Sequence, residues 1–245
     1  MKTLVIIPSR LSAKRLPGKP LLKINGLSII SHVFKRAEKA NIGEVIVAAE
    51  DKEIVEDVEK NGGQAILTST RHKTGTDRIY EAFQKLNKKD IDLVMNLQGD
   101  EPMININDIK ELYYQMQNTK SQMGTLASEI NDKYLYNNEN VVKVITKDSL
   151  NISKFSEAIG FKRKISDLNQ NIYHHIGVYC FKLRTLEKFV SFNQTENEIK
   201  NKLEQLRAID NNINIKVSLA KSSPIGVDTE EDFVAIKKLM EYKSK

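Results

Sequence analysis

Four short apolar runs in the first 100 residues predict strands that are buried on both faces. Runs of this length, bounded by polar or turn-forming residues, are typical of the inner strands of a parallel sheet. The runs are TLVIIP (3–8), EVIVAA (44–49), QAIL (64–67) and DLVMNL (92–97).

Apolar residues at helical spacing separate these runs. The spacing predicts a helix over 28–41, a second from Asp51 as its N-cap to Asn61, and a third over 76–87. Gly62 and Gly63 supply a left-handed stop for the second helix. Because strands and helices alternate over the first 117 residues, we expect an α/β fold with a mostly parallel sheet and helices on both faces.

After Gly124 the pattern favours strands with fewer helices between them. We expect strands in 124–130, 141–146, 152–156, 174–182 and 213–220, and helices over 184–192, over 198–210 and from Thr229 onward. The composition of the polar patches is not that of a linker. The chain is therefore predicted to be one domain, 1–245, interrupted by a smaller β-rich extension at about 124–183.

Composition and charge narrow the classes of protein. Apolar residues make up 40% and charged residues 29%, which excludes a disordered chain. The net charge of +6 suits an anionic partner: nucleic acid, a phosphorylated small molecule or a membrane surface. Cys180 is the single cysteine, so no internal disulfide forms and a reducing cytoplasm is expected. No apolar run is long enough for a membrane span, so no membrane insertion is expected.

A basic loop follows the first predicted strand. In PSRLSAKRLPGKP (8–20) the cations are Arg10, Lys14, Arg15 and Lys19, and the loop contains no acid. It lacks the glycine signatures of P-loop and dinucleotide sites, so side-chain cations are expected to bind the anion. Arginine forks and ammonium groups at this spacing suit a triphosphate. The alternative is a solvated basic loop.

Acidic residues follow two predicted strands. Asp100 and Glu101 come after the fourth strand, and the loops after the first and fourth strands lie at one edge of a parallel sheet. Asp228 lies at another strand-to-helix junction. Mg²⁺ prefers one or two carboxylates together with substrate phosphates, so Asp100 and Asp228 are predicted to hold it. The alternatives are a turn residue for Asp100 and a helix cap for Asp228.

Two further signals are weak by themselves. The segment TGT (74–76) before a helix offers bare backbone to a base or ribose, and is equally a plain turn. His174 and His175 begin a predicted strand, where histidines more often pack or lie at the surface than bind a ligand.

In combination these segments resemble the 3-deoxy-manno-octulosonate cytidylyltransferase (CMP-KDO synthetase) family. The matching segments occur in the family's order over nearly the whole chain: PSRLSAKRLPGKPL, TGTDR, NLQGDEP, HIGVY, LEQLR and GVDTEED. The resemblance implies a nucleotide-diphospho-sugar transferase fold and a cytoplasmic homodimer with the β-rich part in sugar binding and dimer contacts. It also implies that CTP and a keto-sugar acid give CMP-sugar and pyrophosphate for lipopolysaccharide-type glycan synthesis.

The resemblance assigns roles to residues that match the family's positions. Arg10, Arg15 and Lys19 would bind the CTP phosphates and, with Asp100, form the catalytic set, while Asp100 and Asp228 would hold Mg²⁺. The remaining residues would bind the nucleoside (Thr74, Gly75, Thr76 and Gln98) and the sugar (His175, Tyr179, Glu204 and Gln205).

One segment departs from the family. After Phe155 and Ser156, where the family has Arg and then an Ile-Pro pair, this chain has Glu157, Ala158, Ile159 and Gly160. A glutamate beside the substrate carboxylate would repel it, which suggests an altered acceptor such as an amino-bearing octulosonate. The alternatives of another class are a nucleotide-sugar-using glycosyltransferase and a nucleic-acid-binding protein. The latter requires basic residues interleaved with aromatics, which this chain lacks, so no nucleic acid partner is expected.

Overall fold

The chain forms two compact units. The computed structural model describes residues 1–13, 15–151, 155–165, 170–223 and 226–243; Lys14 of the basic loop and residues 152–154 of one expected strand lie outside these ranges. We call the units the α/β unit (Lys2–Ile91, Met95–Ile109 and Pro224–Lys245) and the barrel unit (Met1, Asp92–Val94 and Lys110–Ser223).

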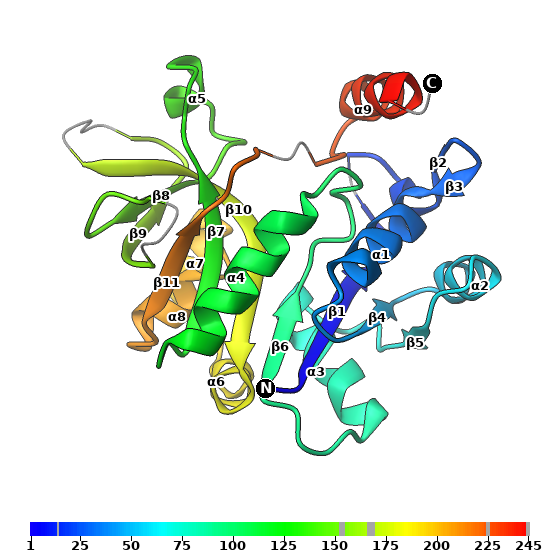
Figure 1. Ribbon diagram of the computed structural model, residues 1–245, viewed down its shortest axis with the longest axis horizontal. Helices are drawn as coiled ribbons and strands as arrows, with labels where there is room; N and C mark the ends of the chain where they lie inside the picture. Colours follow the sequence, from blue (N-terminus) through cyan, green and yellow to red (C-terminus); the bar gives the residue numbers. More distant parts are fainter. Residues whose placement is uncertain (14, 152–154, 166–169, 224–225, 244–245) are drawn as a thin grey trace. The chain divides into compact units, whose positions relative to one another are not determined.

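The α/β unit has the alternating strands and helices that the sequence predicts (Figure 1). Its strands β5, β4 and β1 pair side by side and are all parallel. The Leu97 amide, just after β6, donates to the Ile6 carbonyl of β1 at 3.2 Å. The elements are β1 (Thr3–Ser9), η1 (Lys19–Leu21), β2 (Lys23–Ile24), β3 (Leu27–Ser28), α1 (Ile29–Ala40), β4 (Glu44–Ala49), α2 (Lys52–Lys60), β5 (Ala65–Leu67), α3 (Gly75–Leu86) and α9 (Glu230–Lys243). Strand β6 (Leu93–Asn96) and helix α4 (Ile106–Asn118) each contain residues of both units.

Helix boundaries in this unit follow local capping chemistry. Ser28 caps α1 by accepting from the Ser31 amide, and Asn41 ends the helix in the left-handed conformation. Helix α3 begins at Gly75 instead of Thr76, because Thr74 is its cap. Asp51 occupies the N-cap position of α2 as expected, but its side chain makes no capping bond, so that detail of the prediction is wrong.

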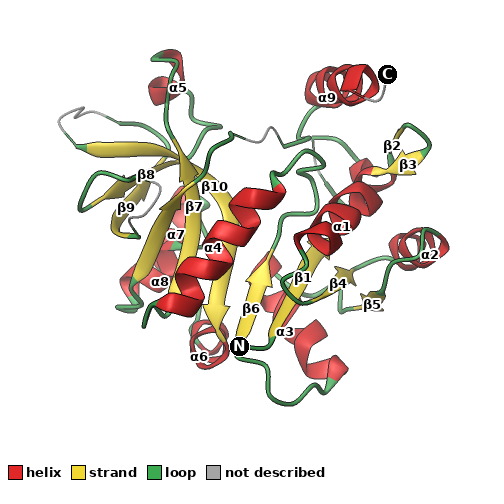
Figure 2. Cartoon of the chain, viewed as in Figure 1, coloured by secondary structure: helices red, strands yellow, loops and turns green. Residues whose placement is uncertain are grey.

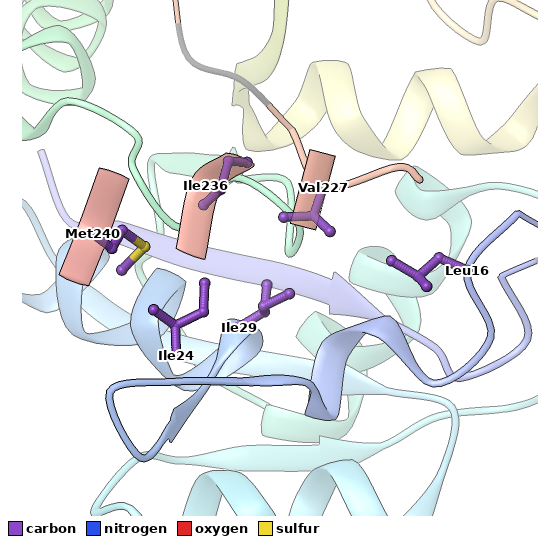
Figure 3. Close-up of a cluster of buried hydrophobic side chains, with 6 residues drawn as sticks. All are labelled: Leu16, Ile24, Ile29, Val227, Ile236 and Met240. Atoms are coloured by element: carbon purple, nitrogen blue, oxygen red, sulfur yellow. The ribbon is translucent and has the colours of Figure 1, made fainter. Parts of the chain in front are cut away.

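The C-terminal segment packs on the N-terminal part of the same unit. Figure 3 shows the cluster of buried side chains that joins them, drawn from the basic loop, β2, α1 and the segment around α9: Leu16, Ile24, Ile29, Val227, Ile236 and Met240. Burial of such side chains contributes about 1.5–3 kcal/mol each. This packing fixes the backbone that carries Asp228, the next residue after Val227.

The barrel unit contains a closed sheet of five strands (Figure 2). Going round, β10 pairs with β7, β7 with β11, β11 with β9, β9 with β8, and β8 with β10. Only the β7–β11 pair is parallel. The elements of this unit are β7 (Met123–Ser128), α5 (Tyr134–Asn137), β8 (Lys143–Thr146), β9 (Ser156–Lys162), β10 (Asn171–Lys182), α6 (Leu183–Ser191), α7 (Glu196–Asn201), α8 (Leu206–Asp210) and β11 (Ile215–Leu219). The α/β class is thus confirmed, with a mixed sheet.

Two predictions for this unit are wrong in detail. The strand expected to end at Ser156 begins there. The single helix expected over 198–210 is two helices, because Lys202 takes a left-handed conformation (φ 54°) that ends α7. The two helices are joined by a buried ion pair, in which the Arg207 guanidinium donates to both Glu198 carboxylate oxygens at 2.8 and 2.7 Å.

Candidate active site

The basic loop leaves β1 as a compact turn in the α/β unit. The Leu11 carbonyl accepts from the amides of Ala13 and Gly18 at 2.8 and 3.0 Å. Gly18 has φ 72°, a conformation that favours glycine, and it precedes the short helix η1. Arg10 is exposed and the Arg15 side chain is 54% exposed, so both guanidinium groups lie at the surface of the unit.

Lys19, at the end of the loop, is the centre of the site. Its Nζ donates to Asp100 Oδ2 at 2.5 Å, to Asp228 Oδ1 at 3.2 Å and to the Val227 carbonyl at 2.9 Å. These three bonds use all the donors of an ammonium group. Burial acts to lower the pKa of Lys19, but the two carboxylates outweigh it and raise this pKa above its usual 10.5. The ammonium is therefore charged and held between two carboxylates from distant parts of the sequence.

Asp228 belongs to this cluster and is not a helix cap. Its Oδ2 accepts from Arg15 Nη2 at 2.9 Å while its Oδ1 binds Lys19. The start of α9 is capped by other groups: Thr229 Oγ1 accepts from the Asp232 amide at 3.2 Å, and Asp232 Oδ2 accepts from the amides of Asp228 and Thr229 at 3.1 and 2.9 Å. The alternative interpretation of Asp228 as a cap is therefore excluded.

Glu101 is a residue of the site for which the sequence pattern predicts no separate role. Its Oε2 is buried and has no hydrogen-bond partner among the residues that the structure describes. Burial, with the nearby charges of Asp100 and Asp228, raises the pKa of Glu101 to about 8. The DE pair after a buried strand was the available signal, but residue type alone does not show which of two adjacent acids is solvated.

The donor set suits a hard divalent cation. Asp100 and Asp228 already converge on one positive charge, and a buried carboxyl oxygen of Glu101 lies close by without a donor. Within the described ranges no three or more His, Cys, Asp or Glu side chains form a metal-binding group. Two carboxylates with open positions for phosphate and water fit Mg²⁺ and do not fit a structural zinc site.

The expected nucleoside segment lies against the end of β1. A Cβ at Gly75 would lie 3.5 Å from Pro8 Cγ, and one at Gly99, next to Gln98, would lie 2.8 Å from the Pro8 carbonyl oxygen. Thr74 Oγ1 accepts from the Asp77 amide and donates to Asp77 Oδ2, and Thr76 is buried. The loops after β1 and β6 and the start of α3 therefore meet around Pro8, and TGT is a helix start and not a plain turn.

The four expected sugar-binding residues form a mostly buried group in the barrel unit. His175 and Tyr179 lie on β10 with ring centroids 5.5 Å apart, and Gln205 is the N-cap residue of α8. Burial raises the pKa of Tyr179 well above its usual value, and the charge of Glu204 adds to this effect. Burial and the neighbouring His174 lower the pKa of His175 to about 3. His175 is therefore a neutral imidazole, with Nε2 3.1 Å from Thr125 Oγ1.

Glu157 lies on the other face of the barrel wall from His175. Val217 pairs with both Thr125 and Ser156, so these side chains share the face on which Thr125 meets His175. The next pair, Lys216 and Glu157, points to the opposite face, where Lys216 Nζ lies 3.7 Å from Glu157 Oε2. At Gly160 an added Cβ would meet no heavy atom within 4 Å. In the structure Glu157 has a cationic partner and does not face the expected sugar residues.

Comparisons with known proteins agree with this arrangement. A family model described as "Cytidylyltransferase" matches residues 4–216. A 3-deoxy-manno-octulosonate cytidylyltransferase from Afipia carboxidovorans is 39% identical over 244 residues, which cover 97% of this chain and 96% of the relative. One from Thermodesulfovibrio yellowstonii is 40% identical over 251 residues, which cover 98% of each.

Solved structures give the same result for the fold. The structure of CMP:2-keto-3-deoxy-manno-octonic acid synthetase complexed with CTP matches with a TM-score of 0.89 and 32% identity, over 99% of this chain and 100% of that one. A cytidylyltransferase from Leptospira borgpetersenii, 19% identical over 99% of this chain and 87% of that chain, shares the fold with a TM-score of 0.64. None of the helices in the part of the chain that the structure describes is long and apolar enough to cross a bilayer. The chain belongs to the cytidylyltransferase family.

Proposed function

We propose that this nucleotidyltransferase activates 3-deoxy-manno-octulosonate with CTP, giving the CMP-sugar and pyrophosphate, for lipopolysaccharide-type glycan synthesis. In this reaction the anomeric hydroxyl of the sugar attacks the α-phosphorus and a new P–O bond forms. Pyrophosphate leaves with the electrons of the broken P–O bond, and the hydroxyl proton passes to solvent. The observation that carries the proposal is the convergence of Lys19, Asp100 and Asp228 at the end of the basic loop. Near full-length relatives at about 39–40% identity bear this activity as their name.

In the proposed site the cations bind the triphosphate. Arg10 and Arg15 have exposed guanidinium groups on one loop, and an arginine fork pairs well with phosphate oxygens. Lys19 contributes to phosphate binding once its ammonium exchanges a carboxylate oxygen for a phosphate oxygen. These fixed charges oppose the negative charge that grows on the phosphoryl oxygens in the transition state. Thr74, Gly75, Thr76 and Gln98 form the nucleoside pocket.

Asp100 and Asp228 would hold Mg²⁺. When bound, the ion supplies charge neutralisation at the phosphates and lowers the pKa of a coordinated hydroxyl. The carboxylates of this chain contribute a fixed pair of oxygen ligands, oriented by Lys19 and by the Arg15 contact to Asp228. Asp228 is held in place by the packing of Val227 in the cluster of Figure 3.

The sugar acid is assigned to the barrel unit. A neutral His175 accepts or donates one hydrogen bond at each ring nitrogen without placing a charge beside the sugar hydroxyls. Tyr179, Glu204 and Gln205 supply further donors and acceptors. We further propose that residues 124–183 serve sugar binding and contacts in a homodimer, that the fold is of the nucleotide-diphospho-sugar transferase type with helices on both sheet faces, and that the enzyme acts in the cytoplasm.

The alternative acceptor, an amino-bearing octulosonate, rested on a repulsive Glu157. Because Glu157 pairs with Lys216 on the face away from His175, we propose the unmodified sugar as the substrate. Comparing turnover of the two sugars tests this assignment. Efficient use of the 8-amino sugar alone would restore the alternative.

A pyrophosphate-release assay with several nucleotides and a panel of keto-sugar acids tests the proposed function. We expect release only with CTP and 3-deoxy-manno-octulosonate together, and a loss of at least about a hundredfold for Asp100→Asn and Asp228→Asn if each removes an important metal ligand. A glycosyltransferase would release no pyrophosphate from CTP. Activity of Asp100→Asn near the wild-type level would overturn the metal assignment.

A further inference from the structure

Asp51 lies at the N-cap of α2, but its side chain forms its hydrogen bond outside that helix. It precedes α2 with extended backbone angles (φ −116°, ψ 142°) that suit a cap, and aspartate is a preferred capping residue. The side chain nevertheless makes no bond to the first turn of α2. Its Oδ2 instead accepts from the Leu11 amide at 2.8 Å, across forty positions of sequence.

The Leu11 peptide group is the point at which the basic loop is tied together. Its amide donates to Asp51, while its carbonyl accepts from the Ala13 and Gly18 amides. Asp51 therefore holds a peptide group on which both sides of the loop depend. The bond is charge-assisted, because a carboxylate accepts from a backbone N–H.

The neighbouring Glu50 reinforces the link between the end of β4 and the basic loop. Its amide donates to the Ser9 carbonyl at 3.0 Å, and its Oε1 lies 3.4 Å from Ser12 Oγ. Its Oε2 forms an ion pair with Arg78, whose side chain is 4% exposed and whose Nη1 also donates to Thr68 Oγ1 and to the Ser69 carbonyl. The end of β4 is thus anchored on one side to α3 and on the other to the basic loop.

We infer that Asp51 is a positioning residue for nucleotide binding: its carboxylate holds Leu11, and so keeps the described loop residues, 10–13 and 15–19, in the form that presents Arg10 and Arg15 to one anion. The inference rests on the proposed function, in which that anion is the triphosphate of CTP. The negative charge of Asp51 near a phosphate site repels the nucleotide and by itself lowers its affinity. The hydrogen bond to the Leu11 amide offsets this cost because it positions the loop.

Three variants separate this role from a structural one. Asp51→Ser keeps a residue that caps helices well but is too short to reach Leu11. Asp51→Asn keeps an acceptor oxygen of the same reach without the charge. Glu56→Gln, at an exposed position of the same helix, removes one negative charge and serves as the matched control.

The readouts are CTP binding by calorimetry, KM for each substrate, thermal stability, and hydrogen exchange of the Leu11 amide. We expect Asp51→Ser to weaken CTP binding about tenfold or more, Asp51→Asn about threefold, and Glu56→Gln not at all. KM for the sugar acid and the melting temperature should stay near wild type in all three. The Leu11 amide should exchange faster in Asp51→Ser than in the wild type.

Unchanged CTP affinity in Asp51→Ser would overturn the inference, as would an equal loss for both substrates together with a lower melting temperature. If Asp51→Ser does not fold, the difference in CTP affinity between Asp51→Asn and Glu56→Gln tests the inference instead. Failure of the wild-type protein to bind CTP would instead overturn the proposed function. The two failures are therefore distinguishable.

Discussion

The ammonium of Lys19 occupies the position between Asp100 and Asp228 where a divalent cation is expected. One positive charge, at 2.5 and 3.2 Å from two carboxylate oxygens, keeps the pair of acids close together. Without it, two like charges would face one another in a partly buried site, which is unfavourable. The lysine thus prepares the ligand geometry that the metal needs and also competes with the metal for it.

This competition predicts the behaviour of Lys19→Met. In the absence of nucleotide, the variant should bind Mn²⁺, a spectroscopic substitute for Mg²⁺, about tenfold more tightly than the wild type, because about 1.4 kcal/mol of competing attraction is removed. CTP binding should weaken at the same time. Electron paramagnetic resonance titration measures free Mn²⁺, and Lys23→Met, at an exposed position of β2, is the control. Weaker Mn²⁺ binding in Lys19→Met would contradict this picture.

At the residue scale, the sequence indicates which side chains belong to the site more reliably than it indicates the role of each side chain. Asp100 stood out because it follows a buried run, and Asp228 because it lies at a strand-to-helix junction, yet cap and ligand remained equal alternatives for Asp228. The choice depends on Asp232, which takes over the bonds at the start of α9 and leaves Asp228 to Lys19 and Arg15. No rule of spacing distinguishes these two acids before the chain is folded.

At the scale of elements, helix ends with strong local signals were predictable and those set by tertiary contacts were not. Ser28 and Asn41 bound α1 through their own chemistry. By contrast, the break at Lys202 places a non-glycine residue in the left-handed region, where the buried pair of Glu198 and Arg207 fixes both flanking helices. Helical periodicity alone cannot show such a break, because the cause lies in side-chain packing.

Glu81, on α3, contacts the loop before this helix and gives a prediction about how stability depends on pH. Burial acts to raise the pKa of Glu81, but hydrogen bonds from Lys85, His72 and the Ser69 amide lower it to about 2. Because the folded-state pKa is depressed, Glu81 stabilises the fold above pH 4.5, and this contribution is lost as the pH falls toward 2.

Glu81→Gln should therefore unfold more easily than the wild type at pH 7, by about 2–3 kcal/mol in urea denaturation, with less than about half of that difference remaining at pH 3. The Glu81 side chain is 21% exposed, so solvent screening reduces the effect only in part. Glu59→Gln, exposed on α2, should match the wild type at both pH values. A constant difference at pH 7 and pH 3 would show that the loss comes from packing instead of from the charge.

Close packing of the loop after β6 against β1 gives a second prediction for the elements. A methyl group at Gly99 would lie 2.8 Å from the Pro8 carbonyl oxygen and 3.1 Å from Ile30 Cδ1, and the backbone oxygen cannot move at small cost. We expect Gly99→Ala to lower the melting temperature by about 2–12 °C, because overpacking costs about 1–3 kcal/mol and each kcal/mol lowers the melting temperature of a chain of this length by about 2–4 °C. Gly160→Ala, with no neighbour within 4 Å, should change it little. Equal melting temperatures for the two variants would contradict the contact.

At the scale of the whole molecule, the net positive charge and the exposed arginines of the proposed phosphate site both act on an anionic substrate. The chain carries a net charge of +6, and the exposed arginines of the basic loop, Arg10 and Arg15, belong to the proposed phosphate site. Exposed charges are screened by salt over a distance that falls from about 10 Å at 0.1 M to about 3 Å at 1 M. The partly buried contacts of Lys19 are screened less.

Raising KCl from 50 to 500 mM should therefore increase KM for CTP several-fold, while kcat at saturating CTP changes little. Sucrose at matched osmolarity is the control for solvent effects. Unrelated DNA should show no gel shift at physiological salt if the basic loop is a nucleotide site. A salt-independent KM together with a DNA shift would favour the nucleic-acid alternative.

Contacts between segments far apart in the sequence could be predicted only in part. The alternation of strands and helices predicts which loops share the carboxyl edge of a parallel sheet, and the family resemblance orders the motifs. Closure of the five-stranded barrel depends on the β8–β10 pairing, which joins strands whose registers only the folded chain fixes. The pairings of β11 with β7 and with β9 place Glu157 and His175 on opposite faces.

The packing of Val227, Ile236 and Met240 on residues near the N-terminus has a consequence for biosynthesis. Translation delivers Lys19 and Asp100 long before Asp228, so a chain still on the ribosome has one carboxylate for its ammonium and no pair for a metal. A product that stops before residue 226 would bear the loop of residues 10–19 without the segment that closes over Leu16 and Ile24. We expect such a product to lack the carboxylate pair proposed for the metal and to expose the apolar side chains of Leu16 and Ile24.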